Sequence, residues 1–206
     1  MQLYLVRHGQ SQNNLGQTSA HNVPMTSVGE EQIGLAANEL STMRFDAIYC
    51  SPLHRALQTA TILHARLKNK PVAHPMFSEV GFSWGEPDAS RERLESTYPN
   101  VIFDESITES GWAPMNHETE DEAYERAGRV IRFLCERHPA EDSCVLMVSH
   151  GRFGSILIGY LVGTGPRGYS LFSQHNGAIS GVEIADAGVK LRFLNATPHL
   201  QGKLLT

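Results

Sequence analysis

Short apolar runs alternate with segments of helical periodicity along this chain. The apolar runs cover residues 3–6, 45–50 and 144–149, with a shorter one at 71–74. Between and after them, apolar residues recur at three- and four-residue spacing, which is typical of helices packed on one face. Strands that alternate with helices indicate an α/β fold. We therefore predict a three-layer α/β sandwich, in which helices flank a mostly parallel sheet.

Local signals refine this outline. Thr26 is expected to cap one helix, while Ser51 as N-cap and Pro52 at the first helical position predict that the next helix starts directly after a strand. The runs 178–184 and 189–195 predict a hairpin. Periodicity disappears over residues 77–117, a length that in compact domains usually signals function. We expect one domain over residues 1–206, with a lid or specificity insert at 77–117.

Three predicted strands end in similar chemistry. Arg7, His8 and a glycine follow the first, Ser149, His150 and Gly151 end the late one, and Arg55 lies just after the second. Because parallel strands present their carboxyl ends at one edge of a sheet, these side chains can converge. A single histidine or arginine at such a place is more often structural. Two histidines and two arginines together predict a pocket for a phosphoryl dianion, with His8 as the candidate nucleophile.

Composition excludes several other classes of protein. The 206 residues carry a formal net charge of −5 and a pI near 6.0, which argues against a nucleic-acid partner. No apolar stretch is long enough to span a bilayer, and the first residues predict a strand rather than a signal peptide. The three cysteines form no CxxC pair, so we expect reduced thiols in a cytoplasmic protein.

Longer motifs accompany the strand ends in a fixed order. Asn14 follows the end of the first predicted strand, and residues 25–32 read Met-Thr-Ser-Val-Gly-Glu-Glu-Gln. Residues 51–60 read Ser-Pro-Leu-His-Arg-Ala-Leu-Gln-Thr-Ala, and residues 195–200 read Asn-Ala-Thr-Pro-His-Leu. Together with the two histidine motifs, these segments resemble the histidine phosphatase superfamily, or phosphoglycerate mutase-like family. The resemblance extends over nearly the whole chain, and the block at 51–60 is its most specific part.

The resemblance implies a mechanism that the residue chemistry supports. His8 would attack phosphorus and become a phosphohistidine. Arg7, Arg55 and His150 would hold the phosphoryl oxygens. Asn14 would add a neutral donor, and Gly151 and Asn176 are also expected at the phosphate. No metal or cofactor is expected, because the two arginines supply positive charge.

An alkoxide leaving group needs a proton donor, and the family places a glutamate after the second helix. Glu79 occupies that position here, although the residues that follow it depart from the family order. Glu86 is the alternative acid. In addition, Glu118 with Arg126 resembles a Gly-Glu-Ser…Arg pattern of the family.

We therefore expect a phosphomonoester hydrolase that acts on a small phosphorylated metabolite. A phosphoglycerate mutase is the first alternative, but the insert that such mutases usually carry after the acid is missing. A non-catalytic phosphate-binding module is the second, although a pure binder needs no nucleophile. Sugar phosphates, phosphoglycerate, phosphoserine and nucleotides all stay open as substrates.

Overall fold

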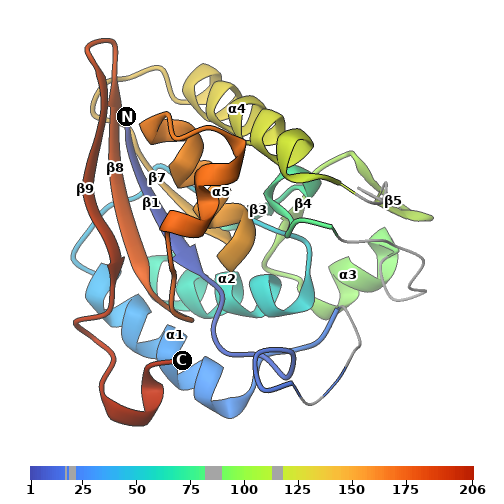
Figure 1. The fold of residues 1–206 in the computed structure, drawn as a ribbon. Coiled ribbons are helices and arrows are strands. Elements are labelled where there is room, and N and C mark those ends of the chain that lie inside the picture. Colours follow the sequence, from blue (N-terminus) through green and yellow to red (C-terminus); the bar gives the residue numbers. More distant parts are fainter. Residues whose placement is uncertain (17, 19–21, 82–89, 113–117) are drawn as a thin grey trace.

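A seven-stranded sheet forms the centre of the computed structural model, which describes residues 1–16, 18, 22–81, 90–112 and 118–206 (Figure 1). Its first five strands in spatial order are parallel, and the last two are antiparallel to their neighbours. In that order the strands are β4 (Ile102–Phe103), β3 (Pro71–Ala73), β2 (Ala47–Cys50), β7 (Cys144–Ser149), β1 (Gln2–Arg7), β8 (Ile179–Ala185) and β9 (Gly188–Ala196). The predicted mostly parallel sheet is confirmed.

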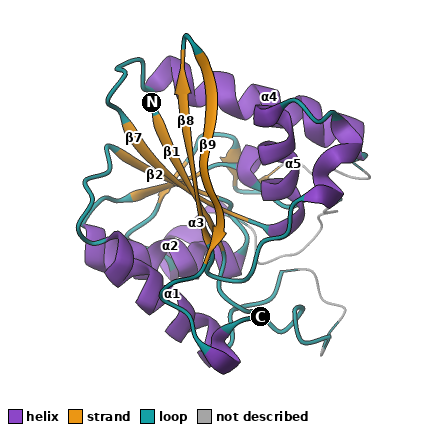
Figure 2. Cartoon of the chain, turned by 60° about the vertical axis from the view of Figure 1, so that its left-hand side comes forward, coloured by secondary structure: helices purple, strands orange, loops and turns teal. Residues whose placement is uncertain are grey.

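Helices cover both faces of the sheet (Figure 2). The strand residues alternate accordingly: Leu146 and Val148 of β7 pack with the helices of one face, and Val145 and Met147 with those of the other. The first face carries α1 (Ser27–Leu40), α2 (His54–Leu67) and the short α3 (Arg91–Thr97), and the second carries α4 (Glu120–Arg137) and α5 (Gly151–Val162). The predicted three layers are thus confirmed. Within the described residues, no helix is both long and apolar enough to cross a membrane.

The strand order places the motif-bearing strand ends side by side. β7 lies between β1 and β2, with Arg7 paired to Ser149 and Cys50 paired to Val148. All three strands run in the same direction, so their carboxyl ends lie together at the lower end of the sheet in Figure 1. The residues that follow these strands therefore meet, although His8 and His150 are far apart in sequence.

The helix starts agree with the sequence at one place and differ at another. Thr26 caps α1 as predicted, because its side chain accepts a hydrogen bond from the N–H of Gly29. The prediction that Ser51 caps α2 is wrong. Its N–H continues the β-type pairing to Val148, and its hydroxyl accepts from the N–H of Leu53, which closes a short turn. Leu53 is the N-cap, and α2 begins at His54.

The described part of the region that lacks periodicity, residues 77–81 and 90–112, contains only short elements. Besides α3 and β4 it contains a two-stranded hairpin of β5 (Ile107–Thr108) and β6 (Gly111–Trp112). Elements of two to seven residues are too short to show a period, which explains the missing pattern. Glu86 lies outside the described residues. The hairpin predicted near the C-terminal end is confirmed as β8 and β9.

Candidate active site

The backbone around His8 is fixed by two glycines that touch across elements. A Cβ atom at Gly9 would lie 2.4 Å from the carbonyl oxygen of Gly29, and one at Gly29 would lie 2.2 Å from the carbonyl oxygen of Gln10. Only glycine fits at either position. The first turn of α1 therefore packs directly against the loop that follows β1, and this contact helps to fix the position of His8.

His8 is held as a neutral imidazole with its lone pair on Nε2. Its Nδ1 lies 2.7 Å from the carbonyl oxygen of Gly9, which can only accept, so Nδ1 carries the proton. Arg55 Nε donates to His8 Nε2 over 3.1 Å. Burial, and then the charges of Arg55 and Arg7, hold the pKa of His8 well below its usual range. This is the protonation state that a nucleophile requires.

Two arginines flank this imidazole, of which Arg55 is buried and Arg7 is half-buried. Arg55 comes from the first turn of α2, and although burial lowers its pKa to about 10, it stays protonated at neutral pH. Arg7 donates from Nη1 to the carbonyl oxygen of Gln174 over 2.5 Å. Burial lowers the pKa of Arg7, and the carboxylate of Glu79 opposes that shift. Both side chains therefore offer positive charge beside His8.

Gly151 allows Arg7 to lie against the start of α5. A Cβ atom at position 151 would lie 3.1 Å from Nε and 3.3 Å from Cζ of Arg7, which is closer than an ordinary contact. The predicted site residue Gly151 is thus adjacent to the guanidinium.

Several polar atoms at this place lack partners within the described part of the chain. They are Nε of Arg7 and both ring nitrogens of His150, all of them buried. His150 is the N-cap of α5, and its ring centroid lies 5.1 Å from that of His8. Burial and the charge of Arg55 are the main causes that hold its pKa well below the usual range. Buried polar atoms are normally satisfied, and a polar ligand between Arg7, His8 and His150 could supply the partners.

Glu79 joins the same site through the N-terminus of α5. Its Oε1 accepts from the N–H of Val80 over 2.9 Å and from that of Phe153 over 2.8 Å, and its Oε2 accepts from the N–H of Arg152 over 3.3 Å. The carboxylate therefore caps the helix that starts after His150. Two of the first backbone N–H groups of α5, those of Arg152 and Phe153, are thus bound to Glu79.

Asn14 and Asn176 meet behind His8. Nδ2 of Asn176 donates to the carbonyl oxygen of His8 over 3.0 Å and to Oδ1 of Asn14 over 3.2 Å. Oδ1 of Asn14 also accepts from the N–H and the hydroxyl of Ser11, both over 2.9 Å. Asn176 is buried and its oxygen accepts from Thr206, so its amide supports the backbone of His8. Asn14 is exposed, and its NH2 group donates to no acceptor among the described residues.

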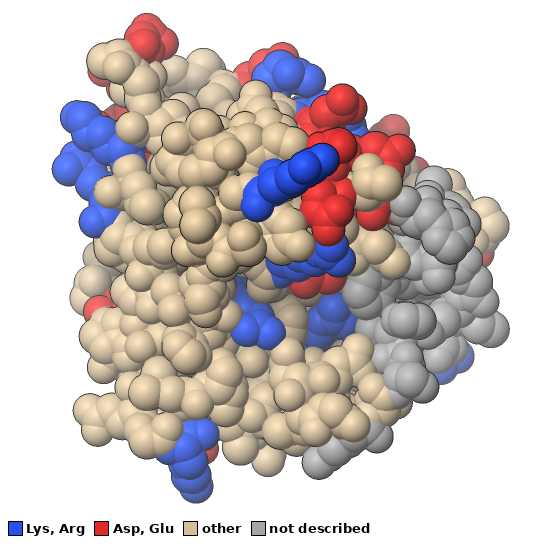
Figure 3. Space-filling model, viewed as in Figure 1, with Lys and Arg blue, Asp and Glu red and all other residues tan. Residues whose placement is uncertain are grey.

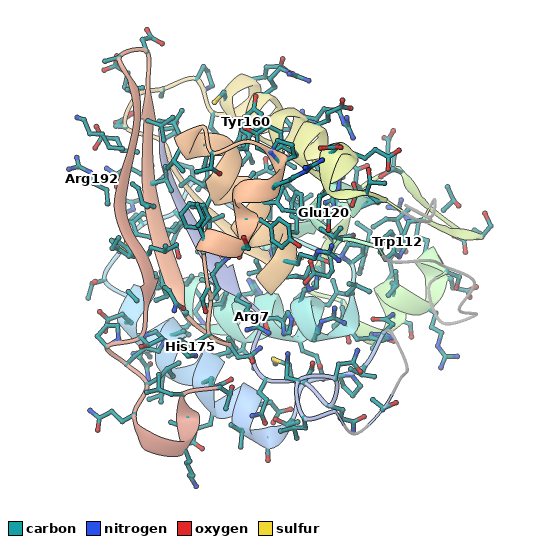
Figure 4. The ribbon with its side chains drawn as sticks, in the orientation of Figure 1. Arg7, Trp112, Glu120, Tyr160, His175 and Arg192 are labelled. Atoms are coloured by element: carbon teal, nitrogen blue, oxygen red, sulfur yellow. The ribbon has the colours of Figure 1, made fainter. Side chains whose placement is uncertain are left out.

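The surface is hollowed at this end of the sheet. Figure 3 shows Lys or Arg atoms recessed in the hollow, and Figure 4 places Arg7 there, with Glu120 above it and Arg192 on the distant β9. Local positive charge inside an acidic protein suits a small anion. Over the part of the chain that is described, no group of three or more His, Cys, Asp or Glu is arranged to hold a metal.

The lowered pKa values of His8 and His150 predict a stability loss in acid. In an unfolded chain both imidazoles bind protons below about pH 6.5, whereas the folded chain keeps them neutral. Protonation therefore favours the unfolded state, by up to about 1.4 kcal/mol per pH unit for each histidine as the pH falls below about 6.5. Denaturant unfolding at about pH 7.5 and about pH 5.5 should show this loss, and His150→Gln should reduce it. If the free energy of unfolding of His150→Gln falls as much as that of wild type between these pH values, the assignment to His150 is contradicted.

A family model for the histidine phosphatase superfamily (branch 1) matches residues 3–197. The chain belongs to this superfamily. The site geometry agrees with the membership, because three segments that carry the family resemblance meet there: those with Arg7 and His8, with Arg55, and with His150. The resemblance inferred from the motifs is thereby confirmed.

Individual members of the superfamily that are similar to this chain carry different names. The adenosylcobalamin/alpha-ribazole phosphatase of Escherichia coli K12 is 29% identical over 201 residues, covering 95% of this chain and 96% of its own. A probable phosphoglycerate mutase, GpmB of Yersinia enterocolitica, is 29% identical, covering 91% and 86%. The crystal structure of the alpha-ribazole phosphatase of Shigella flexneri superposes with a TM-score of 0.73 at 27% identity, covering 96% and 97%.

Some contacts of the site were not foreseen from the sequence. The carbonyl oxygen of Gln174 holds Arg7, and no motif could signal it, because any residue has such a carbonyl. The capping of α5 by Glu79 joins positions 74 residues apart. Arg126, noted only as part of a family pattern, donates to the carbonyl of Ser78, next to Glu79.

Proposed function

We propose that this protein hydrolyses phosphomonoesters through a phosphohistidine at Nε2 of His8. The observation that carries the proposal is the buried, neutral His8, whose lone pair faces the arginine-lined hollow while its other nitrogen is tied to Gly9. A binding module needs cations but not an imidazole held in the nucleophilic tautomer. The unpartnered atoms of Arg7 and His150 complete a cradle for phosphoryl oxygens.

In the first half-reaction the phosphoryl group moves from substrate to His8. Arg55 gives up its bond to Nε2 and turns to the phosphoryl oxygens, as do Arg7 and His150. The N–P bond forms as the P–O bond to the leaving group breaks. Glu79 gives its proton to the departing oxygen, so that an alcohol leaves rather than an alkoxide.

In the second half-reaction water takes the place of the leaving alcohol. Glu79, now a carboxylate, removes a proton from the water as its oxygen attacks phosphorus. The P–N bond breaks, the electron pair returns to Nε2 of His8, and inorganic phosphate leaves. The cycle thus returns a proton to Glu79 and the lone pair to His8.

A small phosphorylated metabolite is the proposed substrate class. The relatives named above include an alpha-ribazole phosphatase, and the fold neighbours include a phosphoserine phosphatase of Entamoeba histolytica bound to phosphoserine. His8, Arg55 and His150 are buried, which favours a compact phosphate ester over a protein surface. We propose a cytoplasmic location, because the free thiols of Cys50, Cys135 and Cys144 suit a reducing compartment.

Hydrolysis and mutase activity are separated by one assay. The purified protein should release inorganic phosphate from nitrophenyl phosphate and from a panel of sugar, glycerate, serine and nucleoside phosphates. The rate should be unchanged by EDTA, because Arg7 and Arg55 supply the positive charge. Interconversion of 2- and 3-phosphoglycerate should be slow, with or without 2,3-bisphosphoglycerate as primer. Fast, primer-dependent interconversion would make the mutase the correct assignment, and loss of activity in EDTA would refute metal independence.

A further inference from the structure

Arg126 of α4 forms a buried ion pair near the site. Its Nε donates to Oε1 of Glu118 over 2.7 Å, and its Nη2 donates to Oε2 over 2.6 Å. Both side chains are almost completely buried, with 1% of Arg126 and 4% of Glu118 exposed. A buried pair of this kind adds little to stability compared with apolar packing, so its presence calls for another explanation.

The remaining edge of the same guanidinium holds the chain just before Glu79. Nη1 of Arg126 donates to the carbonyl oxygen of Met76 over 2.7 Å and to that of Ser78 over 3.0 Å. Ser78 precedes Glu79 directly, so these two bonds fix the point from which the Glu79 side chain extends.

The face of the guanidinium of Arg126 packs against the residue that binds the carboxylate of Glu79. Its Cζ atom lies 3.7 Å from the ring centroid of Phe153, a cation–π contact. The N–H of Phe153 makes the 2.8 Å bond to Oε1 of Glu79. Arg126 thus contacts both the segment that carries Glu79 and the residue that binds its carboxylate.

We propose that Arg126, oriented by Glu118, is a positioning residue that sets the place of the Glu79 carboxylate for proton transfer. This inference rests on the proposed function, in which Glu79 is the general acid. A general acid works only within hydrogen-bond reach of the leaving oxygen, so a small displacement of Glu79 weakens proton transfer. Arg126 does not touch the reacting atoms and acts through Ser78 and Phe153.

Conservative substitutions can separate positioning from charge. Lysine keeps the positive charge at position 126, but its single nitrogen cannot reproduce the planar fork that binds Glu118 and the two carbonyls at once. In Glu118→Gln the side chain keeps its shape but loses its charge, which loosens the orientation of Arg126. Arg91 provides a matched control, because it also binds a glutamate (Glu95) and backbone carbonyls, here those of residues 103, 104 and 107.

The readout is the ratio of kcat/KM for an alkyl phosphate to kcat/KM for nitrophenyl phosphate. Nitrophenolate leaves without a proton, whereas an alkoxide needs one. Arg126→Lys and Glu118→Gln should each lower this ratio about 10-fold, within the range of general-acid effects. Arg91→Lys should leave it unchanged even if it lowers the melting temperature. If Arg126→Lys does not fold, Glu118→Gln alone decides.

A double-mutant cycle gives the decisive result. With Glu79→Gln already present, adding Arg126→Lys should not lower the ratio further, because both substitutions remove the same proton transfer. Independent, multiplicative effects would overturn the inference, as would an unchanged ratio in both single variants while Glu79→Gln lowers it. If Glu79→Gln itself leaves the ratio unchanged, the assignment of Glu79 as the acid is wrong and the positioning role of Arg126 is overturned with it, whereas the other two outcomes overturn the positioning role alone.

Discussion

Replacing His8 with alanine should abolish turnover. The substitution removes the Nε2 lone pair that we propose as the nucleophile, and the protonated guanidinium groups of Arg7 and Arg55 have no lone pair to replace it. We expect kcat to fall on the order of 10⁴-fold or more, as is typical when the nucleophile of a covalent mechanism is lost. Wild-type protein quenched during turnover should carry an acid-labile, alkali-stable phosphoryl group on the peptide that contains His8, and the variant should carry none.

A second histidine serves as the control for this experiment. His64 lies on α2 outside the hollow, where its Nδ1 contacts the carbonyl oxygen of Asn69. His64→Ala should retain both turnover and labelling. Vanadate should still bind to the His8→Ala protein, because Arg7, Arg55 and His150 remain. Near-wild-type turnover by His8→Ala, or labelling at another residue, would show that His8 is not the nucleophile.

Glu79→Gln should slow the hydrolysis of alkyl phosphates far more than that of nitrophenyl phosphate. Glutamine cannot give a proton to an alkoxide, so kcat/KM for a sugar phosphate should fall by about 10²-fold or more. For nitrophenyl phosphate the fall should be only a few-fold, because its leaving group is stable as an anion. Parallel assays with both substrates, at several pH values, measure the difference.

The capping role of Glu79 requires its own control. Because its carboxylate accepts from the N–H groups of Arg152 and Phe153, the substitution also weakens the start of α5, typically by about 1 kcal/mol. That structural effect lowers the melting temperature and slows both substrates equally. Equal slowing would therefore argue against an acid role. A selective effect in Glu86→Gln instead of Glu79→Gln would identify Glu86 as the acid.

Local patterns in the sequence were enough to predict the layers and to select residues that the fold brings together. Apolar runs of four to six residues between amphipathic helices indicate an α/β sheet, because buried strands and one-sided helices each have their own periodicity. Arg7, His8, Arg55 and His150 could be selected because each follows a strand, and strand ends of parallel sheets converge. Thr26 could be recognised as a cap because its partner, Gly29, is only three residues away.

Interactions between distant segments could not be predicted in this way. The strand order, with β7 between β1 and β2, depends on which surfaces pack together, and sequence spacing says nothing about it. The amide of Asn176 reaches the carbonyl of His8 across 168 positions, and Arg126 reaches Ser78 across 48. The prediction that Ser51 caps α2 is wrong because its N–H pairs with the carbonyl oxygen of Val148 in β7, so that α2 starts later.

Residue types at the strand ends are enough to select the groups that could bind and attack a phosphoryl group. The chemical state of those groups depends on the folded chain. Burial and the adjacent guanidinium of Arg55 keep His8 neutral, and the carbonyl of Gly9 selects its tautomer. The start of α5 likewise decides where the carboxylate of Glu79 lies. Such effects arise from distances between atoms that only the folded chain brings together.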